Sequence, residues 1–328
     1  MADFCDEKRK HMKKYIGTAF WACVLIALIV LSLVFGCVKP TACQWATLKV
    51  LMIACGCSIA YCFIVGELSR NYSQMDKLWS TMPIVYAWIV AARGGMEVRL
   101  VVYAVIVTIW GLRLTFNFAR KGAFKGLRFW DGVEDYRWEI LRQNRILKNK
   151  FVWSLFNLFF ISGYQNILVL AICLPAVAMM GSAVPFGAWD VVHIALAALF
   201  LLLEIVADEY QWKFHQKKKA LLSSGKKLED LPAPYDLGFN TTGPWAVMRH
   251  PNYLGEQGLW IALYFFACGA GIGVHGLFHW TFVGPLVLIL LFMGSSELGE
   301  SISSRKYPRY RDYIKQVFKY LPVRKFHR

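Results

Sequence analysis

The sequence has little charge and no cysteine framework. Only 18% of its 328 residues are charged, and several long windows carry no charge at all, which argues against a soluble globule. The nine cysteines are odd in number, and Cys55 and Cys57 have the spacing of neither a redox pair nor half of a zinc site. Several of them lie in apolar segments, where cysteine acts as a small hydrophobic residue. We therefore expect no disulfide framework.

Acidic residues are scarce as well, with 21 Asp and Glu against 37 Lys and Arg, giving a formal net charge of +16. A basic excess can indicate a nucleic-acid partner, but its placement decides the question. Here the basic residues fall in four blocks that alternate with apolar segments, at residues 8–14, 120–150, 213–227 and 305–328. The preference of cytoplasmic membrane loops for Lys and Arg explains this pattern. We therefore expect membrane lipids, and no nucleic acid, as partners.

The sequence is rich in long apolar segments, and hydrophobic residues make up 57% of it. Only helices and closed barrels satisfy backbone polar groups in lipid, so we predict an all-α polytopic integral membrane protein with about eight transmembrane helices. The predicted spans are residues 16–38, 50–66, 83–92 with flanks, 100–118, 152–180, 191–206, 258–276 and 280–293. With both termini cytoplasmic, every basic block faces the cytoplasm. The expected membrane is the endoplasmic reticulum, or the inner membrane if the source is bacterial.

The stretch from Arg249 to Glu256 reads Arg-His-Pro-Asn-Tyr-Leu-Gly-Glu and places ionisable groups at the mouth of an apolar hairpin. We expect Glu256 at or just inside a membrane boundary, where an ionisable side chain is costly and usually has a task. The alternative is a basic juxtamembrane turn, in which Pro251 and Gly255 are ordinary turn residues. The local sequence leaves both interpretations open.

Two further motifs lie near predicted membrane edges. Asp76-Lys-Leu-Trp-Ser80 could orient a polar group on an apolar substrate, or it could be a helix cap with an interfacial tryptophan anchor. Arg113, Asn117 and Arg120 are spaced i, i+4 and i+7, so one helical face carries two guanidinium groups and an amide. This face suits phosphate binding. Arginines that extend toward lipid headgroups are the competing explanation.

Pairs of acidic residues follow two of the later spans. Glu204 and Asp208 are one turn apart and precede Gln211, and Glu297 and Glu300 are spaced i, i+3. The residues that follow the second pair include arginine and tyrosine side chains, at Arg305, Tyr307, Tyr310 and Tyr313. Acids combined with arginine and tyrosine suit a ribose hydroxyl and a phosphate. They equally suit a salt-bridge network.

Two apparent motifs are rejected. Residues 271–276 match the glycine fingerprint of dinucleotide-binding folds, but they lie between spans on the non-cytoplasmic side, with no preceding βαβ strand. His275 and His279 have the i, i+4 spacing of metal ligands but lack an obvious third ligand. We therefore predict no metal site. We also find no nucleophile elbow around a serine or cysteine.

Several motifs carry a family resemblance in combination. They are Asp76-Lys-Leu-Trp-Ser, Trp110-Gly-Leu-Arg-Leu-Thr-Phe-Asn117, Glu134-Asp-Tyr-Arg-Trp138, Gly243-Pro-Trp, the Arg249 to Glu256 box and Tyr307-Pro-Arg-Tyr-Arg-Asp-Tyr313. Together they resemble the steroid 5-alpha-reductase-like superfamily, in its broad branch of membrane oxidoreductases. The Arg249 box also resembles that of isoprenylcysteine carboxyl methyltransferases and phospholipid methyltransferases. The resemblance covers residues 71–322, so we predict an amino-terminal extension with two transmembrane helices (1–70) and a catalytic membrane domain (71–328).

This resemblance implies an enzyme with a cytoplasm-facing cofactor cavity that binds NADPH and reduces an activated carbon–carbon double bond in a steroid, sterol or other lipid. It implies Asp76 and Tyr136 as catalytic candidates, although the steroid reductases have Gln-Glu-x-Pro-Ser near the position of Asp76. The predicted cofactor-binding residues are Arg113, Asn117, Arg120, Asp208, Gln211, Arg249, His250, Asn252, Tyr253, Glu256, Glu300, Arg305 and Tyr310.

Two other functions stay open, an S-adenosylmethionine-dependent membrane methyltransferase and a non-catalytic lipid-binding protein. The motifs around Asp76 and Arg113 favour a reductase over a methyltransferase. A non-catalytic relative would lose the site acids, whereas Asp76, Glu256 and Glu300 are all present. The preference for NADPH over NADH rests on basic residues near the proposed adenosine end, namely Lys213 and Lys217 to Lys219. These lysines could equally be membrane-proximal charge. The oligomeric state is not predicted.

Overall fold

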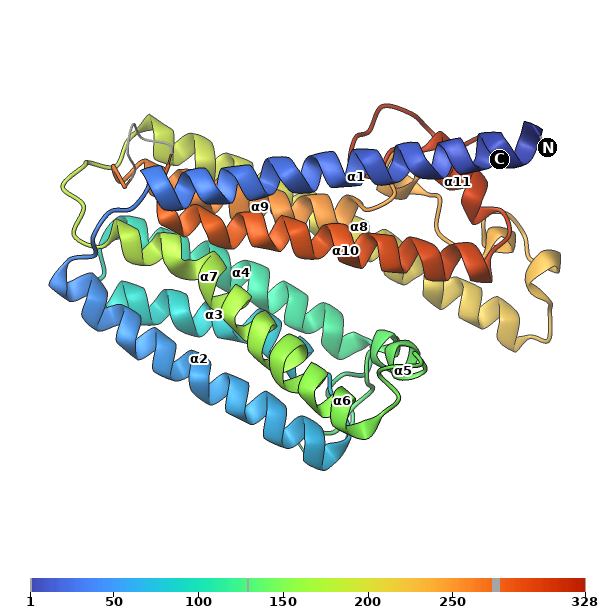
Figure 1. The fold of residues 1–328 in the computed structure, drawn as a ribbon, viewed down its shortest axis with the longest axis horizontal. Coiled ribbons are helices and arrows are strands. Elements are labelled where there is room, and N and C mark those ends of the chain that lie inside the picture. The colour runs from blue at the N-terminus through green and yellow to red at the C-terminus, as the bar shows by residue number, and fades with distance from the viewer. Residues whose placement is uncertain (1, 129, 273–277, 328) are drawn as a thin grey trace. The chain divides into compact units, whose positions relative to one another are not determined.

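The computed structural model describes residues 2–128, 130–272 and 278–327, with side chains from residue 18 onward, and its regular elements there are helices joined by turns and loops. No strand occurs within these residues, so the all-α prediction is confirmed (Figure 1). The long helices are α1 (Ala2–Phe35), α2 (Ala42–Ser69), α3 (Gln74–Arg93), α4 (Val98–Arg120), α7 (Gln165–Met179), α8 (Ala188–Ser223), α9 (Pro251–Cys268) and α10 (Val283–Lys306). The shorter elements are α5 (Tyr136–Arg142), α6 (Lys150–Phe156), the π-helix η1 (Asn157–Tyr164), α11 (Tyr310–Gln316) and the 3-10 turns η2 (Leu228–Asp230), η3 (Tyr235–Leu237), η4 (Gly243–Ala246) and η5 (Trp280–Phe282).

Six helical segments of the described chain are long and apolar enough to cross a membrane, which fits a polytopic membrane protein. They are Thr18–Phe35, Ala42–Ser69, Val98–Arg120, Lys150–Met179, Ala188–Ser223 and Trp280–Lys306. The predicted spans at residues 83–92 and 258–276 correspond to α3 and α9, which are helical but not among these six. Both helices open with polar side chains, such as Asp76 in α3 and Glu256 in α9. The total of eight crossings therefore stays a prediction.

The chain divides into two compact units. The first unit comprises Met1–Val30, Ile194–Ala262 and Leu286–Arg328, and the second comprises Leu31–His193 and Leu263–Pro285. The first unit therefore contains α11 and most of α1, α8, α9 and α10, whereas α2, α3, α4 and α7 belong to the second. The predicted functional boundary at residue 70 is a different division, and it stays a prediction. Each unit is described on its own below.

In the second unit, α3 packs against α2, α4 and α7. Gly111 on α4 allows the close approach to α3, because a Cβ atom there would lie 2.4 Å from the Ser80 carbonyl oxygen. The Ser80 and Thr115 hydroxyl groups bond across the same contact at 2.7 Å. Such small and hydroxylic side chains are typical of helix contacts in membranes. The contact fixes the helix that begins with the Asp76 motif.

In the first unit, α9 packs closely on α8. A Cβ atom on Gly255 would lie 2.8 Å from both the Phe200 carbonyl oxygen and the Glu204 Cβ atom, so the helix backbones meet where glycine leaves room. Tyr253 and Phe292 link α9 to α10, with ring centroids 4.5 Å apart. A second core beyond these helices is built mainly from aromatic residues, namely Leu237, Phe239, Tyr310, Tyr313, Val317 and Phe326. It fixes α11 and the chain end against the segment that precedes α9.

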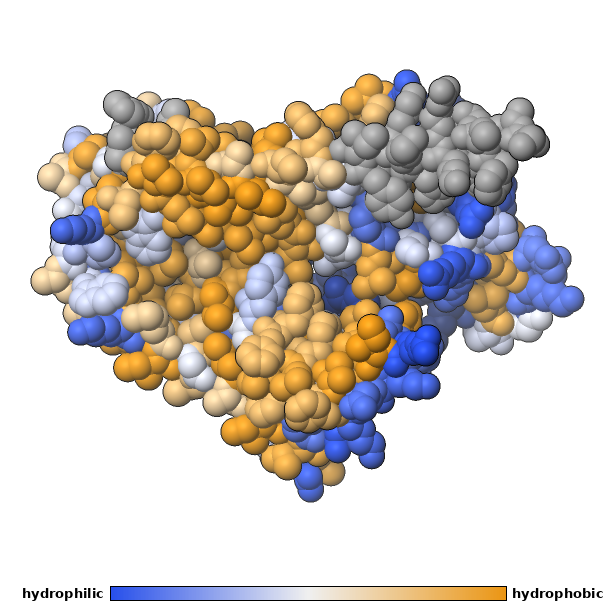
Figure 2. Space-filling view, viewed as in Figure 1, coloured by the Kyte–Doolittle hydropathy of each residue, from blue (hydrophilic) through white to orange (hydrophobic). Residues whose placement is uncertain are grey.

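The surface follows the same pattern of apolar helices and polar ends. Figure 2 shows an apolar surface over the long helices, with hydrophilic residues gathered near α5 and α6 in the second unit and near the carboxyl end of α8 in the first. The 36 residues of α8 would measure about 54 Å at 1.5 Å per residue, far more than the roughly 30 Å of a bilayer core. The basic carboxyl end of α8 therefore extends beyond the membrane.

Candidate functional site

The turn before α9 is held by the end of the chain. Pro251 is the first residue of α9, where its missing N–H costs no helical hydrogen bond. The two preceding residues have buried backbones that need partners. The Arg249 amide donates to the Phe318 carbonyl and the His250 amide to the Lys319 carbonyl, both at 3.1 Å. The side chains of this turn are thus positioned by a segment nearly 70 residues further along the chain.

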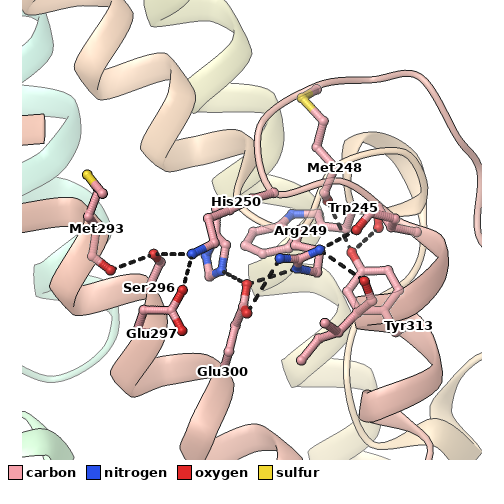
Figure 3. A network of polar contacts seen from close by, with 12 residues as sticks. Trp245, Met248, Arg249, His250, Met293, Ser296, Glu297, Glu300 and Tyr313 are labelled. Atoms are coloured by element: carbon pink, nitrogen blue, oxygen red, sulfur yellow. Dashed lines mark hydrogen bonds and ion pairs between the residues drawn. The ribbon is translucent and has the colours of Figure 1, made fainter. Parts of the chain in front are cut away.

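Those side chains converge on Glu300, which projects from α10 (Figure 3). Arg249 Nε donates to Glu300 Oε1 at 2.8 Å, and His250 Nε2 lies 2.9 Å from the same oxygen. Only 8% of Arg249, 9% of His250 and 1% of Glu300 is exposed. Arg249 Nη1 also donates to the carbonyls of Ile314 and Val317, so this side chain connects α10 with the carboxyl end of α11. A buried carboxylate held in this way is fixed in place and strongly dependent on its partners.

The network continues on both sides of Glu300. On one side, Lys319 Nζ lies 2.6 Å from Glu297 Oε1 and 3.2 Å from the Ser296 hydroxyl. On the other, the Tyr313 hydroxyl donates to the backbone carbonyls of Trp245 and Met248. Figure 3 shows these residues as one polar cluster at the junction of α10, α11 and the turn before α9.

Burial of His250 favours the neutral form of its imidazole. Burial lowers the pKa of its imidazole below the ordinary value of 6.5, and the charges of Arg249 and Lys319 add to this effect. The hydrogen bond and charge of Glu300 oppose the shift without cancelling it. Because a carboxylate only accepts, the single proton of the neutral ring must lie on Nε2. The Tyr253 ring stacks on this imidazole with centroids 5.1 Å apart.

A second polar group in the first unit joins α8 to α9. Asn252 Nδ2 donates to Asp208 Oδ1 at 3.3 Å, and Gln211 Nε2 lies 3.1 Å from His215 Nε2. Three side-chain amide atoms of the first unit are buried without a hydrogen-bond partner in the protein, namely Gln211 Oε1, Asn252 Oδ1 and Asn240 Nδ2. Buried polar atoms are nearly always paired, so these two acceptors and one donor call for a polar partner from outside the chain.

The other predicted cofactor-binding residues of the first unit differ in how deeply they are buried. Glu256 is buried one turn into α9. Tyr310 is buried in the aromatic core, where its ring meets that of Phe239 at 4.8 Å. Arg305 lies exposed in the last turn of α10. The structure thus joins Arg249, His250 and Glu300 directly, and it leaves Arg305 at the surface.

Asp76 lies in the first turn of α3, within a separate polar cluster of the second unit. Its Oδ2 accepts from Trp138 Nε1 at 3.1 Å, and Arg137 approaches Oδ1 at 3.9 Å. Burial raises the pKa of the Asp76 carboxyl, and the Arg137 charge opposes this only in part. The Tyr136 side chain, by contrast, is 57% exposed at the start of α5.

The loop that precedes α5 is held against the start of α3 by three polar side chains, one just before that helix and two in its first turn. Asn71, Gln74 and Lys77 donate to three consecutive carbonyls, those of Gly132, Trp130 and Asp131, at 3.0, 2.9 and 2.7 Å. The Lys77 side chain is buried, and burial lowers the pKa of its ammonium group. A surface pocket of about 320 Å³ lies at this junction, lined by residues 69–71, 130–132 and Glu134. None of the predicted cofactor-binding residues lines it.

The predicted guanidinium face lies on α4. Arg120 Nε donates to the buried Asn117 side chain at 2.8 Å, which joins two of its three members, and Arg113 lies one turn earlier. These residues belong to the second unit, whereas the Arg249 network belongs to the first. Among the residues with described positions, no cluster of three His, Cys, Asp or Glu side chains could hold a metal. Residues 273–276 of the rejected glycine motif, including His275, lie outside the described residues.

Comparison with known proteins places this architecture in a family. The family model described as "Protein of unknown function (DUF1295)" matches residues 62–317. The chain belongs to the DUF1295 family. It is also 34% identical over 278 residues to the uncharacterized protein C594.04c of Schizosaccharomyces pombe (strain 972 / ATCC 24843), covering 79% of this chain and 77% of that protein. No solved structure matches the chain.

The DUF1295 region contains every predicted site residue, from Asp76 to Tyr310. Two residues important to the geometry were not predicted. Asn240 carries the orphaned amide donor, and it lies in the polar run that precedes the Gly243-Pro-Trp motif. Lys319 binds Glu297 and lies beyond the DUF1295 region. It belongs to a basic block that the sequence analysis attributed to membrane orientation alone. The polar run beside a recognised motif was the available signal for Asn240.

Proposed function

We propose that this DUF1295 protein is a membrane oxidoreductase that binds NADPH and reduces an activated carbon–carbon double bond in a steroid, sterol or other lipid. The observation that carries the proposal is the set of orphaned amide atoms on Gln211, Asn240 and Asn252, which lie in the same unit as the buried Arg249 network. Its second support is the resemblance of the motifs in both units to steroid 5-alpha-reductase-like proteins.

The residues of the first unit fit a nucleotide in their chemistry. Ribose hydroxyls donate and accept at once, which matches two orphaned acceptors and one orphaned donor. Arg249 already donates to Glu300 and to two backbone carbonyls, so we assign it a positioning role rather than phosphate binding. Phosphate groups would fall to exposed cations such as Arg305, Lys213 and Lys217.

Asp76 is the residue that we propose for the oxygen end of the lipid. NADPH, when bound, supplies a hydride to the far carbon of an enone-like group. The negative charge then develops on the carbonyl oxygen, which a nearby donor stabilises. A buried carboxyl with a raised pKa retains its proton nearer to neutral pH and can act as that donor. The Trp138 hydrogen bond holds the Asp76 carboxyl in one orientation.

A methyltransferase is the alternative, because the Arg249 to Glu256 box also resembles that of isoprenylcysteine and phospholipid methyltransferases. Binding to the purified protein in lipid nanodiscs separates the two functions. We expect saturable binding of NADPH and no retention of S-adenosylmethionine. Retention of S-adenosylmethionine without NADPH would reverse the assignment.

A variant pair ties this binding to the orphaned atoms. Gln211→Met keeps the length of the side chain and removes the buried oxygen, so it should weaken NADPH binding by about 2- to 13-fold, the equivalent of one net hydrogen bond. The stability of the unliganded protein should be unchanged or higher, since an unsatisfied buried group is removed. Gln216→Met, on an exposed position of the same helix, is the matched control and should change neither quantity.

A further inference from the structure

The end of the chain, residues 318–327, forms a loop that we call the C-terminal strap. Both of its ends are anchored by backbone hydrogen bonds. At its start, the carbonyls of Phe318 and Lys319 accept from the turn before α9 at 3.1 Å. At its end, the Phe326 amide donates to the Ala246 carbonyl at 2.8 Å, and the Phe326 ring is buried in the aromatic core. The middle of the strap therefore projects from two fixed points.

The strap returns to the membrane boundary. The stretch from Trp280 to Ser296 carries no charged residue, so Glu297 marks the point at which α10 leaves the apolar layer. The helix continues to Lys306, about 14 Å further at 1.5 Å per residue. The strap then comes back toward that level, because Lys319 Nζ contacts Ser296 and Glu297. The residues directly after Lys319 thus lie near the level of the boundary.

The tip of the strap is a tight turn with apolar sides. The Val323 amide donates to the Leu321 carbonyl at 2.9 Å, which closes a three-residue turn around Pro322. Leu321 is 60% exposed and Val323 is 68% exposed. Two exposed cations follow, and the Arg324 guanidinium lies 5.3 Å from the centroid of the exposed Phe318 ring. Apolar side chains flanked by cations, at the level of a membrane boundary, are typical of segments that lie in the bilayer interface.

We propose that the C-terminal strap is a membrane-surface anchor that inserts Leu321 and Val323 into the bilayer interface and places Arg324 and Lys325 on anionic lipid headgroups. The turn at Pro322 presents both apolar side chains in a fixed arrangement. Each cation near an anionic surface favours the docked strap by roughly fivefold. Because the strap carbonyls hold the Arg249 and His250 amides, the docked strap also braces the buried network against the membrane surface. This inference does not depend on the proposed reaction.

Photocrosslinking in nanodiscs tests the anchor. The photoreactive residue p-benzoylphenylalanine is placed at Leu321 in one protein and at Lys226 in a matched control. Lys226 is exposed and lies three residues beyond the carboxyl end of α8, and that helix end is about 25 Å from the last residue of the predicted span at 191–206. After irradiation in phosphatidylcholine discs containing phosphatidylserine, intact mass should show a lipid adduct at position 321 and none at 226. Replacing Arg324 and Lys325 by Gln should remove the dependence of the yield on phosphatidylserine.

Three results would overturn the proposal. An adduct of position 321 with another protein chain would identify a protein surface instead, and the absence of any adduct would place the tip in water. Equal lipid adducts at 321 and 226 would show contact without selectivity. Trypsin cleavage after Arg324 provides a second measurement that needs no unnatural residue. Cleavage should be at least several-fold faster when Leu321 and Val323 are both replaced by Ser, and equal rates would also contradict the anchor.

Discussion

Replacement of Glu300 by glutamine removes the charge around which the buried network is built. The carboxylate accepts from Arg249 and His250 and is 1% exposed. A glutamine in its place presents an NH2 group to at least one of these donors. The Arg249 guanidinium is then left buried without a counter-charge. Breaking a buried ion pair from one side costs about 3 to 5 kcal/mol.

This loss can be compared with a neighbouring pair on the same helix. Glu297 lies one turn earlier and pairs with Lys319, but the side chains are 33% and 21% exposed. Pairs that are accessible to water contribute about 0 to 1 kcal/mol. Glu297→Gln is therefore the matched control. For a unit of this size, Glu300→Gln should lower the melting temperature by about 6 to 20 °C and Glu297→Gln by at most about 4 °C.

The assay is thermal unfolding in lipid nanodiscs, followed by circular dichroism. A double variant, Arg249→Met with Glu300→Leu, removes both charges and should recover part of the lost stability. Recovery should be incomplete, because the carbonyls of Ile314 and Val317 lose the Arg249 donor. Equal shifts for Glu300→Gln and Glu297→Gln, or a double variant less stable than Glu300→Gln, would refute the reasoning.

Three other predictions follow from the two clusters. Asp76→Asn should retain NADPH binding and lower turnover by roughly 100-fold or more, whereas Glu256→Gln should weaken NADPH binding first, as measured by titration and steady-state kinetics; the opposite pattern would reverse the two roles. Gly255→Ala places a Cβ atom 2.8 Å from the Glu204 Cβ atom and should destabilise the protein by about 1 to 3 kcal/mol in thermal unfolding. Unchanged stability would show that α8 and α9 do not need to pack this closely. Because burial lowers the pKa of His250, the unfolded state binds more protons below pH 6.5, so stability should fall as the pH drops through that value, and His250→Gln should reduce this slope. An unchanged slope in unfolding measurements from pH 7.5 to 5 would exclude His250 as its source.

The helical content and the i, i+4, i+7 face of α4 followed from local sequence, because hydrophobic length and helical spacing are local properties. The sequence left open what the Arg249 box forms; in the structure its first two residues precede α9 and Pro251 begins that helix. The number of crossings did not follow in the same way. Polar residues at the start of α3 and α9 interrupt the apolar stretches of these helices. Composition alone then does not distinguish a helix that packs inside the protein from one that contacts lipid.

The difference in burial between Glu297 and Glu300 could not be predicted from local sequence. Both acids occupy the same helix at i, i+3, and only the family resemblance singled out Glu300. Their partners decide the difference, since Arg249 arrives from the turn before α9 and Lys319 from the returning strap. Side chains that are brought together from distant segments leave no periodic pattern in the local sequence. Asp76 was open for the same reason, because Trp138 reaches it across 62 positions of sequence.

The central claim is a hydride transfer from NADPH to a lipid, and isotope transfer measures it directly. The purified protein in nanodiscs made from the lipids of its source membrane is incubated with NADPH that carries deuterium at the transferred position. We predict that a lipid gains one deuterium and one proton, and that Asp76→Asn lowers this product by roughly 100-fold. Lipids that gain no deuterium, while a labelled methyl group from S-adenosylmethionine enters them, would contradict the account.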